Sequence, residues 1–499
     1  MGAPVLVGID GGTEGLRVCV YDLKGRECAF HGAAYPTHFP RPGQAEQEPE
    51  DWWGALCQAL PQALRKAGVS GHDVLAIGVD TTCCTVCCLD DDGLPLRPAL
   101  LWMDVRAGAE AATVLATGDA ALDVNNAGLG PVSAEWMIPK ALWVKRHQPE
   151  IYARAATVCE YQDYLNFRLT GVMTASANNT GVRWHYRHDG DGAPRALLAA
   201  LDAEELAEKW PSETVAPGTP IGPLSAAAAE ALGLPQDIPV VQGGADAFIA
   251  MAGLGVVRPG AMALVTGSSH LQLAVTETPV HGRGMWGAYA DVLRPGGFVV
   301  EGGQTSTGSA VAWFRRHLAP GMSYAELDRE AAEVPIGCDG LVAQDHFQGN
   351  RTPYTDAASR GAFAGLSLRH GRGHMFRALL EGVAYGSRLI LETLNSHGIA
   401  IDDITVCGGV TRSPLWTQIH ADALGLPIRV AETGCAPALG SAVFAAIGAG
   451  HFPDLDAAAA AMVHTSHIVE PDPAAHEAHG EAYAVYQRAY PALGEVFRP

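Results

Sequence analysis

Short apolar runs separated by polar turns open the chain and predict the strands of a sheet. These strands are expected at residues 5–9, 16–21, 27–34, 74–79 and 86–89. Between them, residues 48–67 carry the longer spacing of an amphipathic helix, with Pro49 in its first turn and Gly68 after its last. Strands interrupted by such a helix indicate a mixed sheet covered by helices.

The later apolar pattern predicts further helices and then a second series of strands and helices. Helices are expected at 136–147, 159–169, 192–210, 247–254, 374–395, 414–424 and after Ala438. Strands are expected at 239–242, 264–266, 271–276 and 403–407, and a Pro- and Gly-rich connection at 216–223. Because 499 residues exceed what one hydrophobic core usually serves, we place two domains at 1–242 and 243–499, with a cleft between them.

Composition and charge narrow the classes of protein. A net charge of -21 argues against a nucleic-acid partner, since phosphate backbones require clustered Lys and Arg. No uninterrupted apolar run of membrane-spanning length is present, so no membrane association is expected. The first residues lack the pattern of a secretory signal, which favours a cytoplasmic protein.

Four of the eleven cysteines lie together, at Cys83, Cys84, Cys87 and Cys88. Two interpretations are open: a metal or cluster site, or small buried side chains on a strand-turn-strand segment. The second is favoured, because no partner pair of Cys or His follows at a metal-binding spacing.

Two strand-turn-strand segments carry glycine and hydroxyl residues in their turns. Asp10-Gly11-Gly12-Thr13 follows the first predicted strand, and Thr266-Gly267-Ser268 follows a later one. Turns of this type present backbone N–H groups and hydroxyls to phosphate oxygens, although an ordinary hairpin turn can have the same sequence pattern. Asp10, at a strand end, suits a magnesium ion bound through water. The pair of turns suggests a nucleotide held between two related halves.

A third acidic position and two polar clusters complete the candidate chemistry. Asp246 follows Gly243-Gly244 at a helix start, where a carboxylate is either a cap or the base that deprotonates a hydroxyl nucleophile. Gly409 and Ser413 form another Gly-rich strand-to-helix turn, suited to adenine or ribose or else a simple turn. Trp102 and Asp104 combine a flat aromatic ring with a polar group, as sugar-binding sites do, although a Trp also often belongs to the hydrophobic core.

The chain resembles the FGGY carbohydrate kinases over nearly its whole length. The resemblance is strongest at Gly361-Ala362-Phe363-Ala364-Gly365-Leu366 and, seven residues later, at His374-Met375-Phe376-Arg377-Ala378-Leu379-Leu380-Glu381, which fits the family's C-terminal signature. It implies an α/β fold of two actin/hexokinase-like (ribonuclease H-like) domains with a mixed sheet each and an interdomain cleft. It further implies ATP and Mg²⁺ as cofactors, Asp246 as the catalytic base and Asp10 as the magnesium residue. The ATP-binding residues that it implies are Gly11, Gly12, Thr13, Arg17, Thr266, Gly267, Ser268, Gly308, Gly409 and Ser413.

Within that family the chain is most similar to the ribulokinase type. The similarity rests on Ser133-Ala134-Glu135-Trp136-Met137-Ile138-Pro139-Lys140, Val79-Asp80-Thr81-Thr82-Cys83-Cys84-Thr85 and Glu301-Gly302-Gly303-Gln304. It implies a ketopentose acceptor phosphorylated on a primary hydroxyl to the pentulose 5-phosphate. The substrate-binding residues that it implies are Cys83, Trp102, Asp104, Glu135, Asp246 and Glu301. A homodimer is expected by analogy of fold.

Two departures from the family pattern bear on substrate and nucleotide. Glu14 replaces a small hydroxyl residue after Thr13, where a second carboxylate would repel a triphosphate unless a metal or Arg17 compensates. Arg183 stands where an L-ribulokinase would be expected to carry Lys, which favours D-ribulose or a related pentulose. The alternatives are a sugar-alcohol kinase acting on ribitol, erythritol or a similar polyol, and a non-catalytic ATP-dependent switch of the same superfamily.

Overall fold

The first of two large sheets is built from the N-terminal strands. The computed structural model of the protein describes residues 2–497. The six strands of this sheet lie in the order β11-β12-β5-β1-β2-β3, with β1 antiparallel to β2 and parallel to β5. Their bounds are β1 Val5–Gly11, β2 Gly15–Asp22, β3 Glu27–Ala34, β5 Val74–Thr81, β11 Pro220–Pro223 and β12 Pro239–Val241.

Alternate residues of β1 face two different layers of helices. Val5, Val7 and Ile9 pack with helix α1 (Pro49–Ala67) and helix α5 (Tyr161–Thr170). Leu6 and Gly8 face the other side, where α15 (Ala436–Gly448) lies beside α10 (Asp246–Gly253). The final third of the chain therefore returns to cover the sheet made by its first residues.

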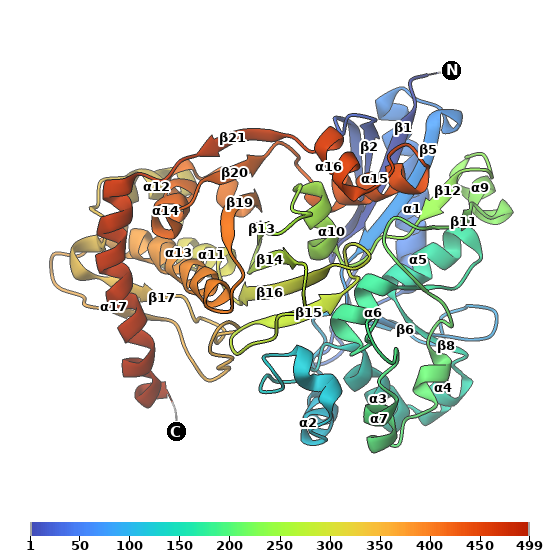
Figure 1. Cartoon of the computed structure of the whole chain (residues 1–499), viewed down its shortest axis with the longest axis horizontal. Helices are drawn as coiled ribbons and strands as arrows, with labels where there is room; N and C mark the ends of the chain where they lie inside the picture. Colours follow the sequence, from blue (N-terminus) through green and yellow to red (C-terminus); the bar gives the residue numbers. More distant parts are fainter. Residues whose placement is uncertain (1, 498–499) are drawn as a thin grey trace.

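The second large sheet belongs to the C-terminal half. Its seven strands lie in the order β15-β16-β14-β13-β19-β20-β21. Their bounds are β13 Gly260–Thr266, β14 His270–Thr276, β15 Trp286–Ala290, β16 Phe298–Gln304, β19 Ile401–Gly408, β20 Ile428–Ala431 and β21 Thr465–Val469. One face packs on α13 and α14, and the other face joins the apolar cluster that contains α10. Figure 1 shows α10 and α15 between the two sheets.

Smaller elements surround these layers. A four-stranded sheet, β4-β7-β6-β8, holds the segment that follows β5, and its bounds are β4 Glu46–Gln47, β6 Val86–Leu89, β7 Ala99–Leu100 and β8 Thr157–Glu160. Two-stranded pairs are β9 Ala175–Ser176 with β10 Thr214–Val215, and β17 Val342–Gln344 with β18 Ala362–Ala364. The remaining N-terminal helices are α2 Gly108–Ala116, α3 Met137–His147, α4 Pro149–Arg154, α6 Ala177–Arg183, α7 Arg195–Ala200, α8 Leu206–Lys209 and α9 Ala226–Leu232. The C-terminal ones are α11 Gly308–Leu318, α12 Tyr324–Ala332, α13 Arg372–Ser396, α14 Pro414–Leu424, α16 Leu455–Met462 and α17 Pro473–Phe497.

The predicted class, an α/β fold with a mixed sheet in each half, is confirmed. Two predicted helices are wrong in detail. The stretch 159–169 begins as the end of strand β8, because Cys159 pairs with Cys87 across the small sheet. The stretch 192–210 is two short helices, α7 and α8, separated around the left-handed residue Asp202. The boundary between 242 and 243 stays a prediction, and α10, just beyond it, packs between the sheets.

Within residues 2–497, the structure contains no helix that is both long and apolar enough to cross a membrane.

Candidate active site

Three carboxylates meet at one edge of the first sheet. The parallel register of β1 and β5 sets Asp10 beside Asp80. One residue further, Thr81 bridges to Ala245, which precedes Asp246 at the start of α10. Because the carboxyl ends of parallel strands share an edge, three distant parts of the sequence deliver acidic side chains to one place. Asp80 lies in the Val79–Thr85 motif, which by itself assigns it no role.

Asp10 is buried and only partly compensated. Its Oδ2 lies 3.0 Å from Nη2 of Arg17 and accepts a hydrogen bond from the Cys435 thiol at 3.2 Å. Burial raises the pKa of Asp10, while the Arg17 charge opposes the rise. Its Oδ1 is buried without a hydrogen-bond partner. This oxygen is therefore available as a ligand for a cation.

The pKa values of the other two carboxylates, Asp80 and Asp246, are also raised. Asp80 accepts a hydrogen bond from Ser441 of α15 at 2.7 Å, and burial next to the Asp10 charge raises its pKa well above the ordinary value. Burial, followed by the charge of Asp10, raises the pKa of Asp246 to about 7. A carboxylate that titrates near neutrality is suited to accept a proton from a hydroxyl group.

The acidic edge fits a magnesium ion that binds partly through water and phosphate. Mg²⁺ is usually held by one or two carboxylates together with waters and substrate phosphates. Asp10 and Asp80 each keep one buried oxygen unpartnered, which agrees with that donor set. Among residues 2–497, no group of three or more His, Cys, Asp or Glu side chains forms a cage for a metal ion.

The first predicted phosphate turn, Gly11 to Thr13, directly follows Asp10. Gly12 donates its N–H to the carbonyl of Gly15 at 3.1 Å and accepts a hydrogen bond from the Tyr35 hydroxyl. The indole N–H of Trp102 donates to the Thr13 hydroxyl at 2.9 Å, so the predicted sugar-facing Trp touches the predicted phosphate turn. Glu14, the next residue, is exposed.

Four of the predicted ATP-binding residues line one cavity of about 490 Å³. They are Gly267, Gly308, Gly409 and Ser413. The apolar walls come from Val311, Phe376, Leu380 and Trp416. A cavity of this size and polarity matches a small-molecule site with room for a planar base. Residues separated by more than 140 positions in the sequence are thus brought together.

The second predicted phosphate turn, Thr266 to Ser268, packs tightly against the segment around Gly308 beside this cavity. A Cβ on Gly308 would lie 2.3 Å from the carbonyl oxygen of Gly267, so that only glycine allows the two segments to touch. The Thr266 hydroxyl donates to the carbonyl of Cys407 at 2.5 Å and accepts from the Val410 N–H at 3.1 Å. Its side chain therefore holds the Gly408–Gly409 turn in place. Ser268 contributes its carbonyl oxygen, which accepts from the N–H groups of Thr307 and Ser309.

The turn that carries Cys83 and Cys84 is held by two buried charges. Glu160 accepts the N–H of Cys84 at 2.8 Å, and Nζ of Lys140 donates to the Cys84 carbonyl at 2.7 Å and to Leu101 at 2.6 Å. Burial lowers the pKa of Lys140 to about 8 and raises that of Glu160. These positioning roles were not predicted from the sequence. The available signal was a charged residue inside an otherwise apolar helix or strand.

The other predicted sugar-binding residues differ in how free their polar atoms are. Asp104 is fully buried, forms a bidentate ion pair with Arg106 and accepts a hydrogen bond from the N–H of Ala45 at 2.7 Å. Both its oxygens are engaged by the protein, so its geometry is that of a residue that positions the Trp102 loop. Glu135 is half-buried and contacts the Ser133 hydroxyl at 3.1 Å.

Glu301 joins Arg183 across the two halves of the molecule. Arg183 of α6 donates to both oxygens of Glu301 of β16, at 2.8 and 3.0 Å, and to the Tyr289 hydroxyl at 2.9 Å. The rings of Trp136 and Trp286 also lie over the guanidinium. Both members of the pair are buried. Both residues were singled out from the sequence, Arg183 as a departure from the family pattern and Glu301 as a predicted substrate-binding residue, but their contact was not predicted.

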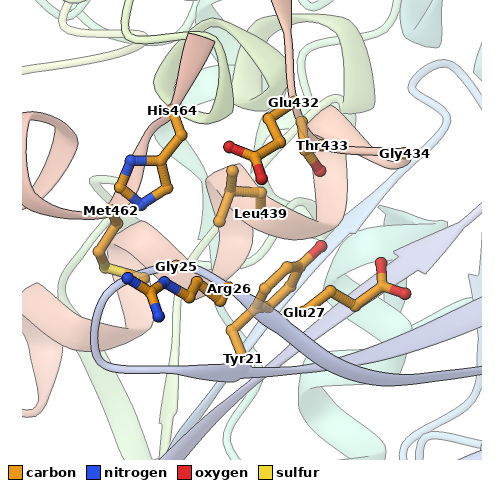
Figure 2. Close-up of a pocket in the computed structure, with 10 residues that line it drawn as sticks. All are labelled: Tyr21, Gly25, Arg26, Glu27, Glu432, Thr433, Gly434, Leu439, Met462 and His464. Carbon is orange, nitrogen blue, oxygen red and sulfur yellow. The ribbon is translucent and has the colours of Figure 1, made fainter. Parts of the chain in front are cut away.

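A second cavity of about 370 Å³ is lined by none of these residues; its walls come from the β2–β3 hairpin, the segment that leads into α15, and the end of α16. Figure 2 shows the side chains of the β2–β3 hairpin on one side and those of the C-terminal half on the other: Tyr21, Arg26 and Glu27 face Glu432, Thr433 and His464. The wall mixes acidic and basic groups, so it indicates no single class of ligand. Its contact with the site is indirect, through the Tyr21 hydroxyl, which donates to the Cys435 carbonyl at 3.4 Å.

Comparison with known proteins agrees with this arrangement. The N-terminal domain of the FGGY family of carbohydrate kinases matches residues 5–253, and the C-terminal domain matches residues 262–449. A ribulokinase of Geobacillus thermodenitrificans is 34% identical, with 90% of this chain and 86% of that protein covered. A xylulose kinase of Bacillus subtilis is 28% identical, over 90% of this chain and 89% of the relative.

Solved structures show the same fold. The xylulose kinase from Rhodospirillum rubrum superposes with a TM-score of 0.85 at 31% identity, covering 99% of each chain. This likeness confirms the predicted actin/hexokinase-like architecture. Two family domains that together cover most of the sequence, on a fold shared with a solved sugar kinase, lead to one conclusion: the chain belongs to the FGGY family of carbohydrate kinases, and the protein is a carbohydrate kinase.

Proposed function

We propose that the protein transfers the γ-phosphoryl group of MgATP to a primary hydroxyl of a ketopentose, D-ribulose or a related pentulose, giving the pentulose 5-phosphate. The observation that carries this proposal is the position of Asp246, at the start of α10 beside Asp10, with a pKa raised to about 7. The similarity to a ribulokinase and to a xylulose kinase supports a pentulose as the acceptor.

Asp246 acts as the general base of this reaction. Its carboxylate accepts the proton of the sugar hydroxyl while that oxygen attacks the γ-phosphorus and the bond to the β-phosphate oxygen breaks. Bound Mg²⁺ would supply charge neutralisation on the phosphate oxygens, with Asp10 as its protein ligand. Gly11, Gly12 and Thr13 on one side and Gly267 and Ser268 on the other offer N–H groups and hydroxyls to the phosphate chain.

The nucleotide base occupies the cavity lined by Gly308, Gly409 and Ser413, with Trp416 and Phe376 as apolar walls. The sugar lies between the Cys83–Cys84 turn, Trp102 and the Arg183–Glu301 pair. In this arrangement Asp104, Lys140 and Glu160 position the sugar-facing loops without contacting the substrate. A homodimer is proposed on fold analogy alone and is tested by the molar mass in solution.

Substitution of the base separates catalysis from nucleotide binding. In Asp246→Asn, sugar-dependent ADP release is expected to fall by about two to four orders of magnitude, because the amide cannot accept the proton. ATP affinity, measured by calorimetry, should stay within about threefold, because the base does not line the nucleotide cavity. Retained turnover would contradict the base assignment, and loss of ATP binding would show that Asp246 acts on the nucleotide instead.

A further inference from the structure

The adjacent thiols Cys83 and Cys84 stand at the tip of the turn between β5 and β6. Their sulfur atoms are 3.5 Å apart. Successive side chains of an extended strand point to opposite faces, so this approach requires a bent backbone. Cys84 supplies the bend with a φ of 66°, in the left-handed region that non-glycine residues seldom adopt. The turn thus presents a preformed vicinal dithiol.

The two thiols differ in how freely they can move. Cys83 is half-buried and reachable, whereas Cys84 is buried. The N–H of Cys84 is held by Glu160 and its carbonyl by Lys140, and both charged side chains are fully buried. Cys83 is therefore the thiol that meets reagents, and Cys84 is a fixed partner behind it.

The Arg183 guanidinium interacts electrostatically with both cysteines, but it is already paired with Glu301. Burial raises the pKa of the Cys84 thiol well above its usual value, so Cys84 stays a thiol until its neighbour is oxidised. The pair thus combines a half-buried thiol with a second thiol within reach, the arrangement in which an oxidised cysteine is resolved as a disulfide.

We propose that Cys83 and Cys84 form a reversible oxidation site that controls sugar binding. This inference rests on the proposed function for its consequence, although not for its chemistry. The Cys83 thiolate attacks the O–O bond of a peroxide, forming an S–O bond and releasing the alcohol or water. The Cys84 thiol then attacks that sulfur, forming the S–S bond and expelling water. Two thiols lose two electrons and the peroxide gains them.

The resulting bond is readily reduced. Neighbouring Cα atoms across a trans peptide are about 3.8 Å apart, shorter than the roughly 4.4–6.8 Å that disulfides usually span. A vicinal disulfide is therefore strained, and strained disulfides have oxidising potentials and yield to dithiol reductants. The site works as a switch and not as a permanent crosslink.

Oxidation changes the sugar side of the turn. To bond, the sulfurs must close from 3.5 Å to about 2.0 Å. Because the Cys84 backbone is held by Glu160 and Lys140, the displacement falls on Cys83 and its backbone. The cavity lined by Gly308, Gly409 and Ser413 contains neither cysteine, so nucleotide binding is left intact.

The test treats the full-length protein with hydrogen peroxide and reads the site by mass and by activity. We expect a loss of about 2 Da assigned by fragment spectra to residues 83 and 84. We expect kcat/KM for the sugar to fall at least about tenfold, with unchanged ATP affinity, and to recover with dithiothreitol. Cys28→Ser, which removes an exposed thiol outside the site, should respond as the unmodified protein does.

Cys83→Ser, normalised to its own reduced rate, should keep its activity under peroxide. The proposal is overturned if the mass loss is absent or lies at other cysteines, or if Cys83→Ser loses the same fraction of activity. The mass loss is read on the protein itself. If the reduced protein phosphorylates no sugar, the proposed function fails while the oxidation site still stands or falls on that mass.

Discussion

At the scale of single residues, the acidic edge of the first sheet concentrates negative charge before any phosphate arrives. Burial, followed by the charge of Asp10, raises the pKa values of Asp80 and Asp246, and Arg17 is the cation paired with Asp10. A magnesium ion bound there would relieve this repulsion and would bring in a polyphosphate that the carboxylates alone repel. The Asp10 charge also contributes to the raised pKa of Asp246, the proposed base.

We expect the pKa of Asp246, the proposed base, to set the pH dependence of the reaction. Because the base must be ionised and its pKa is raised to about 7, kcat/KM for the sugar should fall about tenfold per pH unit below that value and level off above it. In Asp10→Asn, the residual activity should titrate at lower pH, because the Asp10 charge contributes to the rise. A flat profile from about pH 5.5 to 8 would contradict the assignment.

The Arg183–Glu301 pair is expected to contribute to stability as well as to sugar binding. Glu301→Gln leaves a buried guanidinium without its counter-charge, which should lower the free energy of unfolding by about 3 kcal/mol, measured by the urea midpoint. The matched control is Glu208→Gln in the exposed Arg195–Glu208 pair, which should leave that midpoint unchanged. Equal effects of the two variants would show that burial of the first pair is unimportant.

Residues beside strand ends could be predicted from the sequence, whereas their supports could not. Asp10 and Asp246 follow apolar runs and glycine turns, and the structure places both at one sheet edge. Lys140 and Glu160 act on a backbone more than 50 positions away, a contact that no local pattern records. Asp104 was predicted to face the sugar, and the need to pair with Arg106 is visible only once the loop is folded.

At the scale of elements, glycine contacts set how α15 lies on the first sheet. A Cβ on Gly8 would lie 1.9 Å from the carbonyl oxygen of Ala438, and one on Gly78 would lie 2.1 Å from that of Ser441. Between α10 and α15, Gly440 makes the same kind of contact with Ile249. The helix that carries Ser441 to Asp80 is thus placed by backbone contact, which ties packing to the acidic edge.

Enlarging one of these glycines should damage both stability and activity. Gly78→Ala forces the strand and α15 apart, so the free energy of unfolding should fall by about 2 kcal/mol or more and kcat should drop as Ser441 moves from Asp80. The control is Gly54→Ala in α1, where a Cβ meets nothing within 4 Å and the helix should gain about 0.5–1 kcal/mol. Denaturant unfolding and initial rates check both; a silent Gly78→Ala would refute the packing argument.

Elements with strong local signals were predicted well. The predicted β3 and α14 agree with the structure at both ends, since alternation or capping marks them. The strands β15 and β16 and the helix α17 were not predicted. β16 carries two glycines in its interior, and α17 contains Pro491, signals that argue against a regular element until tertiary packing overrides them.

At the scale of the whole molecule, the two large sheets lie on either side of α10 and α15 (Figure 1). Each sheet carries one of the two predicted phosphate turns, between β1 and β2 and between β13 and β14. The acidic edge belongs to the first sheet and the cavity of about 490 Å³ to the second. In the proposed reaction, phosphoryl transfer between them requires both halves around one substrate pair, which would exclude water from the site. The repeated pattern in the sequence predicted two halves, but not that α15 crosses back to the first.

The central claim is that this site phosphorylates a ketopentose. The measurement that tests it most directly is ADP release with MgATP against D- and L-ribulose, D- and L-xylulose, ribitol, erythritol and glycerol. The account predicts that one ketopentose, D-ribulose or a related pentulose, stands well above the polyols in kcat/KM and that Asp246→Asn abolishes the signal. A polyol as the preferred acceptor, or ADP release that does not depend on any sugar, would contradict it.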